Sequence, residues 1–340
     1  MMANFTCNVC GAACERGAEP FGREVPSCAQ CGSTVRLRAL VALLSREILG
    51  MDLPLPKMPV LRNVRGFGMS DPPALAARIA EKFGYTNTFY HQPPVLDITK
   101  PPQEELGSYD FIISSEVMEH VPPPVEDAFA NLYRLLKPNG LLLLTVPYSL
   151  KPQTTEHFPD LHEYALASPG GRTVLVNRRR DGSMEVFENL CFHGGDGSTL
   201  EMRVFTEASL KDVLTGAGFD EVHVASENVA EFGVDHAETW SLPIVARKGK
   251  FQPPAADMVE AYKALSRKIA AVERELEIIR GEYTRYIAFH EQSHKEMEQE
   301  LAKRAEWAMG LDRELKEARA QKAELESRAW VKAGRKLGGV

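Results

Sequence analysis

The stretch from Tyr109 to Tyr148, YDFIISSEVMEHVPPPVEDAFANLYRLLKPNGLLLLTVPY, contains the pattern that decides the fold. Two apolar runs in it, Tyr109–Ser114 and Leu141–Val146, are bounded by turn residues and predict buried strands. Between them, Val125–Leu136 places apolar side chains at helical spacing, after a run of prolines and before a turn that contains proline and glycine. A strand, a helix and a second strand, with both strands uniformly apolar, are typical of a parallel sheet covered on both faces. We therefore predict an α/β fold.

The same stretch resembles a known family. SSEVMEHV after the YDFII strand, followed by LYRLLKPNG and LLLLTVPY, is similar to the second half of class I S-adenosylmethionine (SAM) dependent methyltransferases of the type 11 kind. The similarity extends more loosely over about Pro59–Lys248. It implies a Rossmann-like sheet, SAM as the cofactor and methyl transfer as the reaction. In such sheets ligands bind beyond the carboxyl ends of the strands, here Ser114–His120 and Pro147–Tyr148.

A pair of glycines precedes this stretch. Gly66 and Gly68 follow a predicted first strand, Val60–Val64, and Asp71 with two prolines after it predicts the capped start of a helix. Glycines between a strand and a helix let the backbone approach a ligand closely, although most such pairs are only turns. The resemblance places Gly66, Gly68 and Asp71 in the cofactor site. The family's third glycine and its acidic residue at the end of the first strand are absent here.

The resemblance assigns further cofactor contacts along the chain. After its second strand the family has an acidic residue for the ribose hydroxyls, where this chain has His91 and Gln92. Asp97, with Ile98, lies where the family contacts the adenine amino group. The alternative for Asp97 is an ordinary turn in which it caps Thr99.

The loop after the YDFII strand completes the cofactor residues that the resemblance implies. Ser115 and Glu116 lie where the family's loop lines the cofactor, and Glu119 and His120 come next. The alternative for Glu119 and His120 is that they cap the following turn.

Two CxxC pairs near the start of the chain predict a zinc ribbon. Seventeen residues separate the pairs, a glycine follows each pair, and each pair supplies two thiolates from one tight turn. The predicted ligands of a closed, structural Zn²⁺ site are Cys7, Cys10, Cys28 and Cys31. Cys14 is a possible substitute ligand outside the paired pattern, and Cys191 is predicted to be a buried small hydrophobe.

An insertion follows the second buried strand and is predicted to form the acceptor pocket. Methyl transfer to a hydroxyl needs a base, and histidine suits that role because its pKa lies near neutral pH. The insertion supplies His157 and then His193, and His120 is a third candidate near the cofactor. The alternative for each is a neutral, hydrogen-bonded histidine. A metal site built from the polar segment 157–163 matches no recurrent spacing.

The C-terminal part predicts a coiled coil. Apolar residues alternate by four and three from Leu265 to Tyr286, and the alternation resumes from Met297 to Ala318 after a stutter at His290 and His294. Parallel self-association is the preferred interpretation, with folding back on its own domain or pairing with another protein as alternatives. The basic tail with Trp330 is predicted to fray, with contact to a membrane surface as the alternative.

These features divide the chain into five segments. The predicted segments are a zinc ribbon at 1–35, a connecting helix and linker at 36–58, the methyltransferase-like domain at 59–250 with its insertion at 149–205, a coiled coil at 255–330, and a tail at 331–340.

Composition limits the classes of partner. The net charge of −7 lacks the basic excess that nucleic-acid binding needs, so nucleic acid is disfavoured as a ligand. The N-terminus lacks the cationic start and apolar run of a secretory signal, so such a signal is not expected. No apolar run reaches the length of a membrane span. Without an export signal, the cysteines are expected to be reduced and to bind metal rather than form disulfides. This favours a cytoplasmic protein.

Three functions are compatible with the sequence. By analogy with methyltransferases of surface-glycan synthesis, the first is O-methylation of a sugar or glycan-related acceptor. The second is an RNA methyltransferase, because some rRNA methyltransferases carry an N-terminal zinc ribbon; the acidic net charge weighs against it. The third is a non-catalytic scaffold, which the missing glycine and the missing ribose acid would suit.

Overall fold

A computed structural model describes residues 4–15, 19–193 and 199–327 of the 340-residue chain. The chain divides into two compact units, one that ends at Leu265 and one that begins at Ser266. The predicted tail at 331–340 lies outside the described residues.

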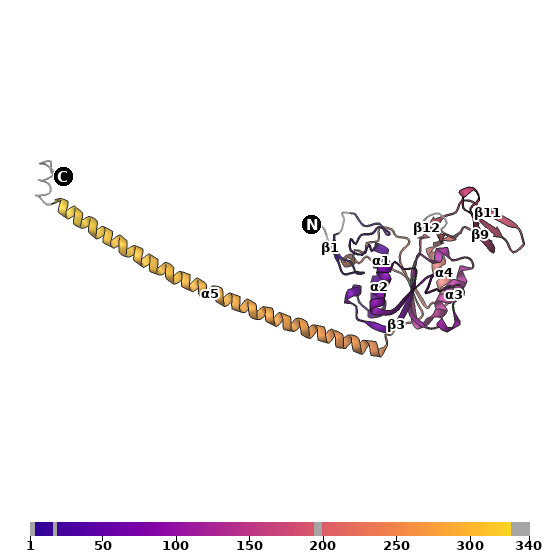
Figure 1. The fold of residues 1–340 in the computed structure, drawn as a ribbon, viewed down its shortest axis with the longest axis horizontal. Coiled ribbons are helices and arrows are strands. Elements are labelled where there is room, and N and C mark those ends of the chain that lie inside the picture. The colour runs from indigo at the N-terminus through magenta and orange to yellow at the C-terminus, as the bar shows by residue number, and fades with distance from the viewer. Residues whose placement is uncertain (1–3, 16–18, 194–198, 328–340) are drawn as a thin grey trace. The chain divides into compact units, whose positions relative to one another are not determined.

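A six-stranded sheet forms the centre of the first unit (Figure 1). Its order is β15-β16-β6-β5-β3-β4, in which β4, β3, β5 and β6 run parallel and β16 runs antiparallel to both of its neighbours. The strands are β3 (Leu61–Met69), β4 (Phe83–Thr88), β5 (Tyr109–Ser115), β6 (Leu136–Thr145), β15 (Glu221–Val224) and β16 (Ile244–Arg247). The predicted α/β fold with a parallel sheet is therefore confirmed, and β15 with β16 adds an antiparallel hairpin at one edge.

Helices cover both faces of this sheet, with α1 and α2 on one face and α3 and α4 on the other (Figure 1). Alternate residues of β5 point to opposite faces, because side chains in a strand alternate. Phe111 and Ile113 pack in the hydrophobic cluster that includes α1 and α2, whereas Ile112 packs in the cluster that includes α3 and α4. The helices are α1 (Val35–Leu49), α2 (Pro73–Lys82), α3 (Val125–Leu135) and α4 (Glu207–Ala217). Both faces are apolar, which explains the uniformly apolar strands.

The first half of the sheet differs from the sequence prediction in two places. The first strand does not stop at Val64 but continues to Met69, so Gly66 and Gly68 lie inside β3. Before Asp97, Val95 makes only an isolated bridge with Phe89. Asp71 is not the cap of α2 either, since Pro72 occupies that position without a side-chain hydrogen bond.

The insertion adds small sheets beside the main one. β10 and β11 form an antiparallel hairpin around the turn at Asp181 and Gly182, and β9 pairs with the other edge of β10. β14, which leads into α4, pairs with β7 and β8, and β12 pairs with β13 in a separate two-stranded sheet. Their bounds are β7 (Tyr148–Ser149), β8 (Thr155–Glu156), β9 (Glu163–Ala167), β10 (Val174–Arg178), β11 (Met184–Phe187), β12 (Phe192–His193), β13 (Thr199–Leu200) and β14 (Arg203–Thr206). The single-turn helices are η1 (Leu55–Lys57), η2 (Gln103–Glu105), η3 (Met118–His120), η4 (Pro169–Gly171) and η5 (Ala230–Phe232).

The N-terminal segment packs directly on this core. It contains the hairpin β1 (Asn4–Thr6) and β2 (Ala13–Glu15), and its buried Cys7 and Cys28 belong to the same hydrophobic cluster as α1, α2 and β5. Arg38 of α1 is fully buried, and it donates hydrogen bonds to Ser33 O at 2.9 Å and to Gly233 O at 3.0 Å. The cysteine-rich segment and α1 therefore share one core with the sheet.

The second unit consists of helix α5 (Ala255–Ser327), whose first turns belong to the first unit. Its predicted seam from Leu265 to Tyr286 is apolar, and the seam side chains are between 48% and 65% exposed. Among the described residues, no helix is long and apolar enough to cross a membrane.

Candidate functional site

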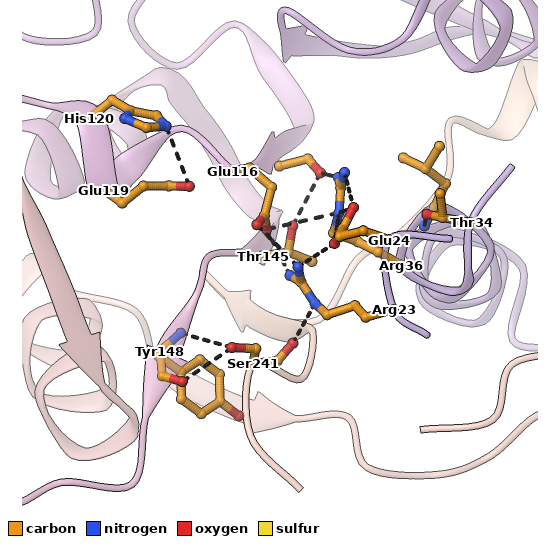
Figure 2. A network of polar contacts seen from close by, with 12 residues as sticks. Arg23, Glu24, Thr34, Arg36, Glu116, Glu119, His120, Thr145, Tyr148 and Ser241 are labelled. Atoms are coloured by element: carbon orange, nitrogen blue, oxygen red, sulfur yellow. Dashed lines mark hydrogen bonds and ion pairs between the residues drawn. The ribbon is translucent and has the colours of Figure 1, made fainter. Parts of the chain in front are cut away.

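The carboxyl edge of β5 and β6 gathers polar side chains, as the fold predicts (Figure 2). Ser115 ends β5, and its hydroxyl lies 3.1 Å from the Thr145 hydroxyl at the end of β6. Glu116 follows with a φ of 58°, a left-handed conformation that non-glycine residues seldom adopt. This turn places the Glu116 carboxylate at the edge where a ligand of a parallel sheet is expected.

Two arginines from the N-terminal segment reach the same edge (Figure 2). Arg23 binds Glu116 through both terminal nitrogens, at 2.7 Å and 3.1 Å, and its Nε donates to Ser241 O at 3.0 Å. Arg36 donates to the Ser115 hydroxyl and lies 4.0 Å from Glu116. Burial raises the pKa of Glu116, but the hydrogen bond and charge of Arg23, with the charge of Arg36, outweigh burial and hold it below its usual value. Sequence reasoning missed both arginines, since neither lies in a motif.

Asp71 lies on the same side of the sheet and is 3% exposed. The Tyr85 hydroxyl donates to its carboxylate, and the Asp71 N–H donates to Asn87 Oδ1 at 2.9 Å. Burial raises the pKa of Asp71 to about 6, against the lowering effects of Tyr85 and of the Arg36 charge. Burial lowers the pKa of Arg36, but its side-chain hydrogen bond to Glu24, together with the charges of Glu116, Glu24 and Asp71, outweighs burial and raises that pKa above its usual value.

The glycine pair has a packing role in β3. A Cβ atom added to Gly66 would lie 2.4 Å from the Phe111 ring, and one added to Gly68 would lie 1.8 Å from Asp71 Oδ2 and 1.9 Å from the Tyr85 hydroxyl. Their absent side chains therefore make room for neighbouring strands. The prediction that they form a loop is wrong, because the strand continues through them.

The other residues predicted to hold the cofactor have contacts of their own, none of which is with Glu116, Arg23 or Arg36 in the described structure. Asp97 Oδ1 accepts hydrogen bonds from the Thr99 N–H at 2.9 Å and the Thr99 hydroxyl at 2.6 Å, which is the turn-capping alternative. Ile98 is buried in the core cluster with α3. His91 is exposed, with its ring centre 4.6 Å from that of Tyr90. Their cofactor contacts stay predictions.

The three histidines predicted as candidate bases come together beside the β5 loop. His157 Nε2 and His193 Nε2 lie 2.9 Å and 3.1 Å from the two carboxylate oxygens of Glu201. The His193 ring centre is 4.8 Å from that of His120. His120 Nε2 is 3.6 Å from the carboxylate of Glu119. The cluster thus combines residues from the β5 loop with residues from both ends of the insertion.

A buried arginine holds this cluster in place. Arg203 of β14 is 1% exposed, and it donates to the backbone carbonyls of Met118 at 3.1 Å and Val121 at 2.6 Å while it binds Glu156 at 2.7 Å. The Met202 N–H also donates to Glu119 O at 2.8 Å. The β5 loop and the end of the insertion are therefore fixed to each other by hydrogen bonds.

The four predicted zinc ligands converge in the N-terminal segment. Their sulfur atoms all lie within 4.8 Å of one another, and two pairs, Cys7 with Cys31 and Cys10 with Cys28, are 3.6 Å apart. Tetrahedral zinc with Zn–S bonds of about 2.3 Å sets its sulfur ligands about 3.8 Å apart, so the arrangement fits the ion. Cys14 lies outside this set, and Cys191 is exposed, which corrects its prediction as a buried residue.

A cavity of about 640 Å³ lies elsewhere, near the amino ends of the parallel strands. Its lining includes Glu47 and Arg247, which bind each other at 2.5 Å, and none of the predicted site residues.

A comparison with protein families matches the part of the chain that contains the central sheet. Residues 60–224 match the family model of a methyltransferase domain. The match spans a little under half of the chain and includes β3 to β6, the insertion, α4 and β15. This part of the chain therefore has the methyltransferase fold that the sequence resemblance implied.

Two curated relatives match shorter stretches of the chain. A ubiquinone biosynthesis O-methyltransferase of Acinetobacter baylyi is 38% identical over 79 residues, which are 23% of this chain and 32% of that protein. A highly reducing polyketide synthase of Fusarium is 43% identical over 53 residues, which are 15% of this chain and 2% of that protein. The chain thus spans at most about a third of these two relatives.

Solved structures of methyltransferases are similar at low identity. A Burkholderia thailandensis 1,6-didemethyltoxoflavin N1-methyltransferase, solved with S-adenosylhomocysteine, is 13% identical with a TM-score of 0.32. The similarity covers 55% of this chain and 71% of that one.

Proposed function

We propose that this protein is a SAM-dependent methyltransferase that methylates a hydroxyl group of a small acceptor, with a sugar or glycan-related molecule as the first choice. The family match over residues 60–224 is the observation that supports methyl transfer most directly. The choice of a sugar rests on the sequence analogy alone. A cytoplasmic location remains part of the same proposal.

The polar groups at the carboxyl edge suit the charged end of the cofactor. SAM carries a methionine carboxylate and ammonium, and its sulfonium supplies the methyl group. Arg36, with Arg23, would hold the carboxylate, because a guanidinium fork matches that group. Glu116 would accept the ammonium after exchanging partners with the arginines. In this proposal the N-terminal segment completes the cofactor site.

The histidine cluster would supply the base. His157 is the first candidate, since Glu201 holds its Nε2 at 2.9 Å and the side chain is 31% exposed toward solvent. A carboxylate that fixes one ring nitrogen orients the other for proton transfer. His193 and His120 are the second and third candidates.

The proposal has one competing function, a non-catalytic scaffold. It is favoured by the Arg23–Glu116 ion pair at the place expected for the cofactor, and by the Asp97 side chain that caps its own turn. A protein that has lost its cofactor would have such satisfied contacts.

Titration calorimetry of S-adenosylhomocysteine and SAM into the full chain distinguishes the two functions. We expect micromolar binding that Arg36→Gln weakens at least about tenfold, because a charged hydrogen bond contributes about 1.5–3 kcal/mol. The matched control is Arg46→Gln on the same helix, where the arginine pairs with Asp52 at 2.6 Å. No binding by folded wild-type protein would reject the methyltransferase and support the scaffold.

A second measurement tests the base. With SAM and nucleotide-sugar acceptors, His157→Ala should lower kcat by at least about a hundredfold while binding of S-adenosylhomocysteine stays unchanged. Retained turnover in that variant would move the role to His193 or His120.

Two further parts of the proposal concern the rest of the chain. A structural zinc ion would hold the N-terminal segment through its four thiolates, and α5 would join copies of the chain through its apolar seam.

A further inference from the structure

A second set of metal-ligating side chains lies at the methyltransferase site, away from the cysteines. The ligand atoms of Glu119, His120 and His193 all lie within 4.8 Å of one another, and Glu201 is 3.1 Å from His193 Nε2. The set joins the loop after β5 to β12 and to the residue after β13, so it exists only in the folded protein. This set differs from the cysteine site and from the polar segment 157–163.

The Glu119 carboxylate supplies an independent observation in favour of a cation site. It is 1% exposed, and within the described part of the chain no other residue hydrogen-bonds to either of its oxygens. Its imidazole neighbour in Figure 2 is His120, whose Nε2 lies 3.6 Å away. A buried carboxylate without donors is costly, because it loses its hydration and gains nothing in exchange. A bound cation would satisfy both oxygens.

The hydrogen bond of His120 Nδ1 leaves the lone pair of Nε2 available to bind a metal. Its Nδ1 lies 2.9 Å from the carbonyl oxygen of Leu200, which can only accept, so Nδ1 carries the proton. The lone pair then belongs to Nε2, which points toward Glu119. A ligating histidine commonly donates its other N–H to a backbone carbonyl in this way, which fixes the ring and its tautomer.

The site is also rigid before any metal binds. Arg203 binds the carbonyls on either side of Glu119 and His120, and Met202 donates to the Glu119 carbonyl. Metal affinity benefits from such order, since the ligands need little rearrangement on binding.

We propose that Glu119, His120 and His193 bind one divalent transition-metal ion, with Glu201 as the adjacent carboxylate that orients His193. Two imidazoles and a carboxylate suit Zn²⁺, Mn²⁺, Fe²⁺ or Co²⁺ better than Mg²⁺ or Ca²⁺, which prefer oxygen ligands. Three protein ligands leave a position open for a further oxygen ligand. If the proposed function holds, that ligand is the acceptor hydroxyl, and His157 remains as the base beside Glu201.

Cobalt titration of the metal-stripped full chain tests the site without SAM or acceptor. Thiolate-to-cobalt absorption reports the cysteine site, and total bound cobalt is measured by mass spectrometry. We expect two ions per wild-type chain, of which only one adds thiolate absorption. Glu119→Gln and His193→Ala should weaken the second ion at least about tenfold and leave the thiolate absorption unchanged.

The matched control is His162→Ala, since this exposed histidine lies outside the cluster. Circular dichroism and thermal unfolding of the metal-free variants, compared with wild type, check that each variant folds. A single cobalt per wild-type chain, bound with thiolate absorption, would overturn the proposal. So would a second ion that survives in folded Glu119→Gln and His193→Ala. Neither result depends on methyl transfer, so failure here is distinct from failure of the proposed function.

Discussion

Glu116 and Glu119 are three residues apart, yet their carboxylates have opposite surroundings. Glu116 receives Arg23 and the charge of Arg36, and its pKa lies below the usual value even though burial opposes this. Burial, with the charge of Glu116, raises the pKa of Glu119 to about 8. One loop thus presents an ionised carboxylate to the arginines and a carboxyl group without a donor to the histidines. This contrast separates the two halves of the site.

Because of Asp71, we expect the free energy of unfolding to depend on pH. Its pKa of about 6 in the folded protein exceeds the usual 3.8, because the charged form is buried. Between these two pKa values the carboxyl group is therefore protonated in the folded state and ionised in the unfolded state. The contribution is present below about pH 4 and is lost as the pH rises to about 6, with a maximum of about 3 kcal/mol. Asp71→Asn should remove this slope from urea unfolding measured between pH 4 and 7.

Tyr85→Phe is the matched variant for that experiment. The Tyr85 hydrogen bond lowers the pKa of Asp71, so its loss should move the slope to higher pH. An Asp71→Asn protein that keeps the wild-type slope would assign the pH dependence to another group.

At the scale of elements, hydrophobic pattern was enough where burial decides structure. The strand, helix and strand around residues 109–148 were predictable, because apolar periodicity reports which faces are buried. The extent of β3 was not. Gly66 resembles a loop residue in sequence, and only its neighbour Phe111, distant along the chain, shows that the missing side chain makes room for a ring.

The site was predictable as separate residues and not as a cluster. Histidine chemistry nominated His120, His157 and His193 one by one. Their meeting around Glu201 depends on how the insertion folds back onto the β5 loop, which Arg203 fixes by long-range hydrogen bonds. Arg23 and Arg36 were missed for the same reason, since their partners lie far away in sequence.

The glycine interpretation leads to a paired substitution. Gly66→Ala should lower the free energy of unfolding by about 1–3 kcal/mol, because the new methyl group overlaps the Phe111 ring. Gly216→Ala in α4 has open space around it and should raise stability by about 0.5–1 kcal/mol through helix propensity. Denaturant unfolding of both variants checks the pair. Equal effects would contradict the packing role of Gly66.

At the scale of the whole molecule, the cysteine-rich segment is connected to the candidate site at the carboxyl edge of the sheet. The segment that carries the cysteines also carries Arg23, and α1, which follows it, carries Arg36. The order of this segment should therefore affect the cofactor site.

Removal of the proposed zinc tests that connection. Cys31→Ser should lower the thermal unfolding temperature and weaken binding of S-adenosylhomocysteine, because zinc supplies about 10 kcal/mol or more of folding free energy to isolated ribbons. The loss should be smaller here, since the segment also packs on the core. Cys14→Ser, outside the four ligands, should bind zinc and S-adenosylhomocysteine as the wild type does. Unchanged unfolding of a zinc-free Cys31→Ser protein would contradict a structural ion.

The exposed seam of α5 predicts that the full chain self-associates. Its residues recur by four and three, the spacing at which two helices bury their apolar side chains together. A seam that is about half exposed along one helix has a large apolar area still in water, and each buried leucine or isoleucine contributes about 1.5–3 kcal/mol. Ile269→Glu with Leu276→Glu should convert the oligomer into monomers, as measured by sedimentation equilibrium.

The matched control is Ile278→Glu, because Ile278 is 63% exposed on the same helix but lies outside the four-three alternation. If non-specific hydrophobic contacts caused self-association, each exposed apolar residue would contribute equally. Ile278→Glu would then weaken self-association as much as either seam substitution. If the seam causes it, only the seam variant should dissociate. A wild-type chain that is monomeric at micromolar concentration would leave pairing with a different protein as the remaining role of α5, since an apolar stripe of this spacing needs a helical partner.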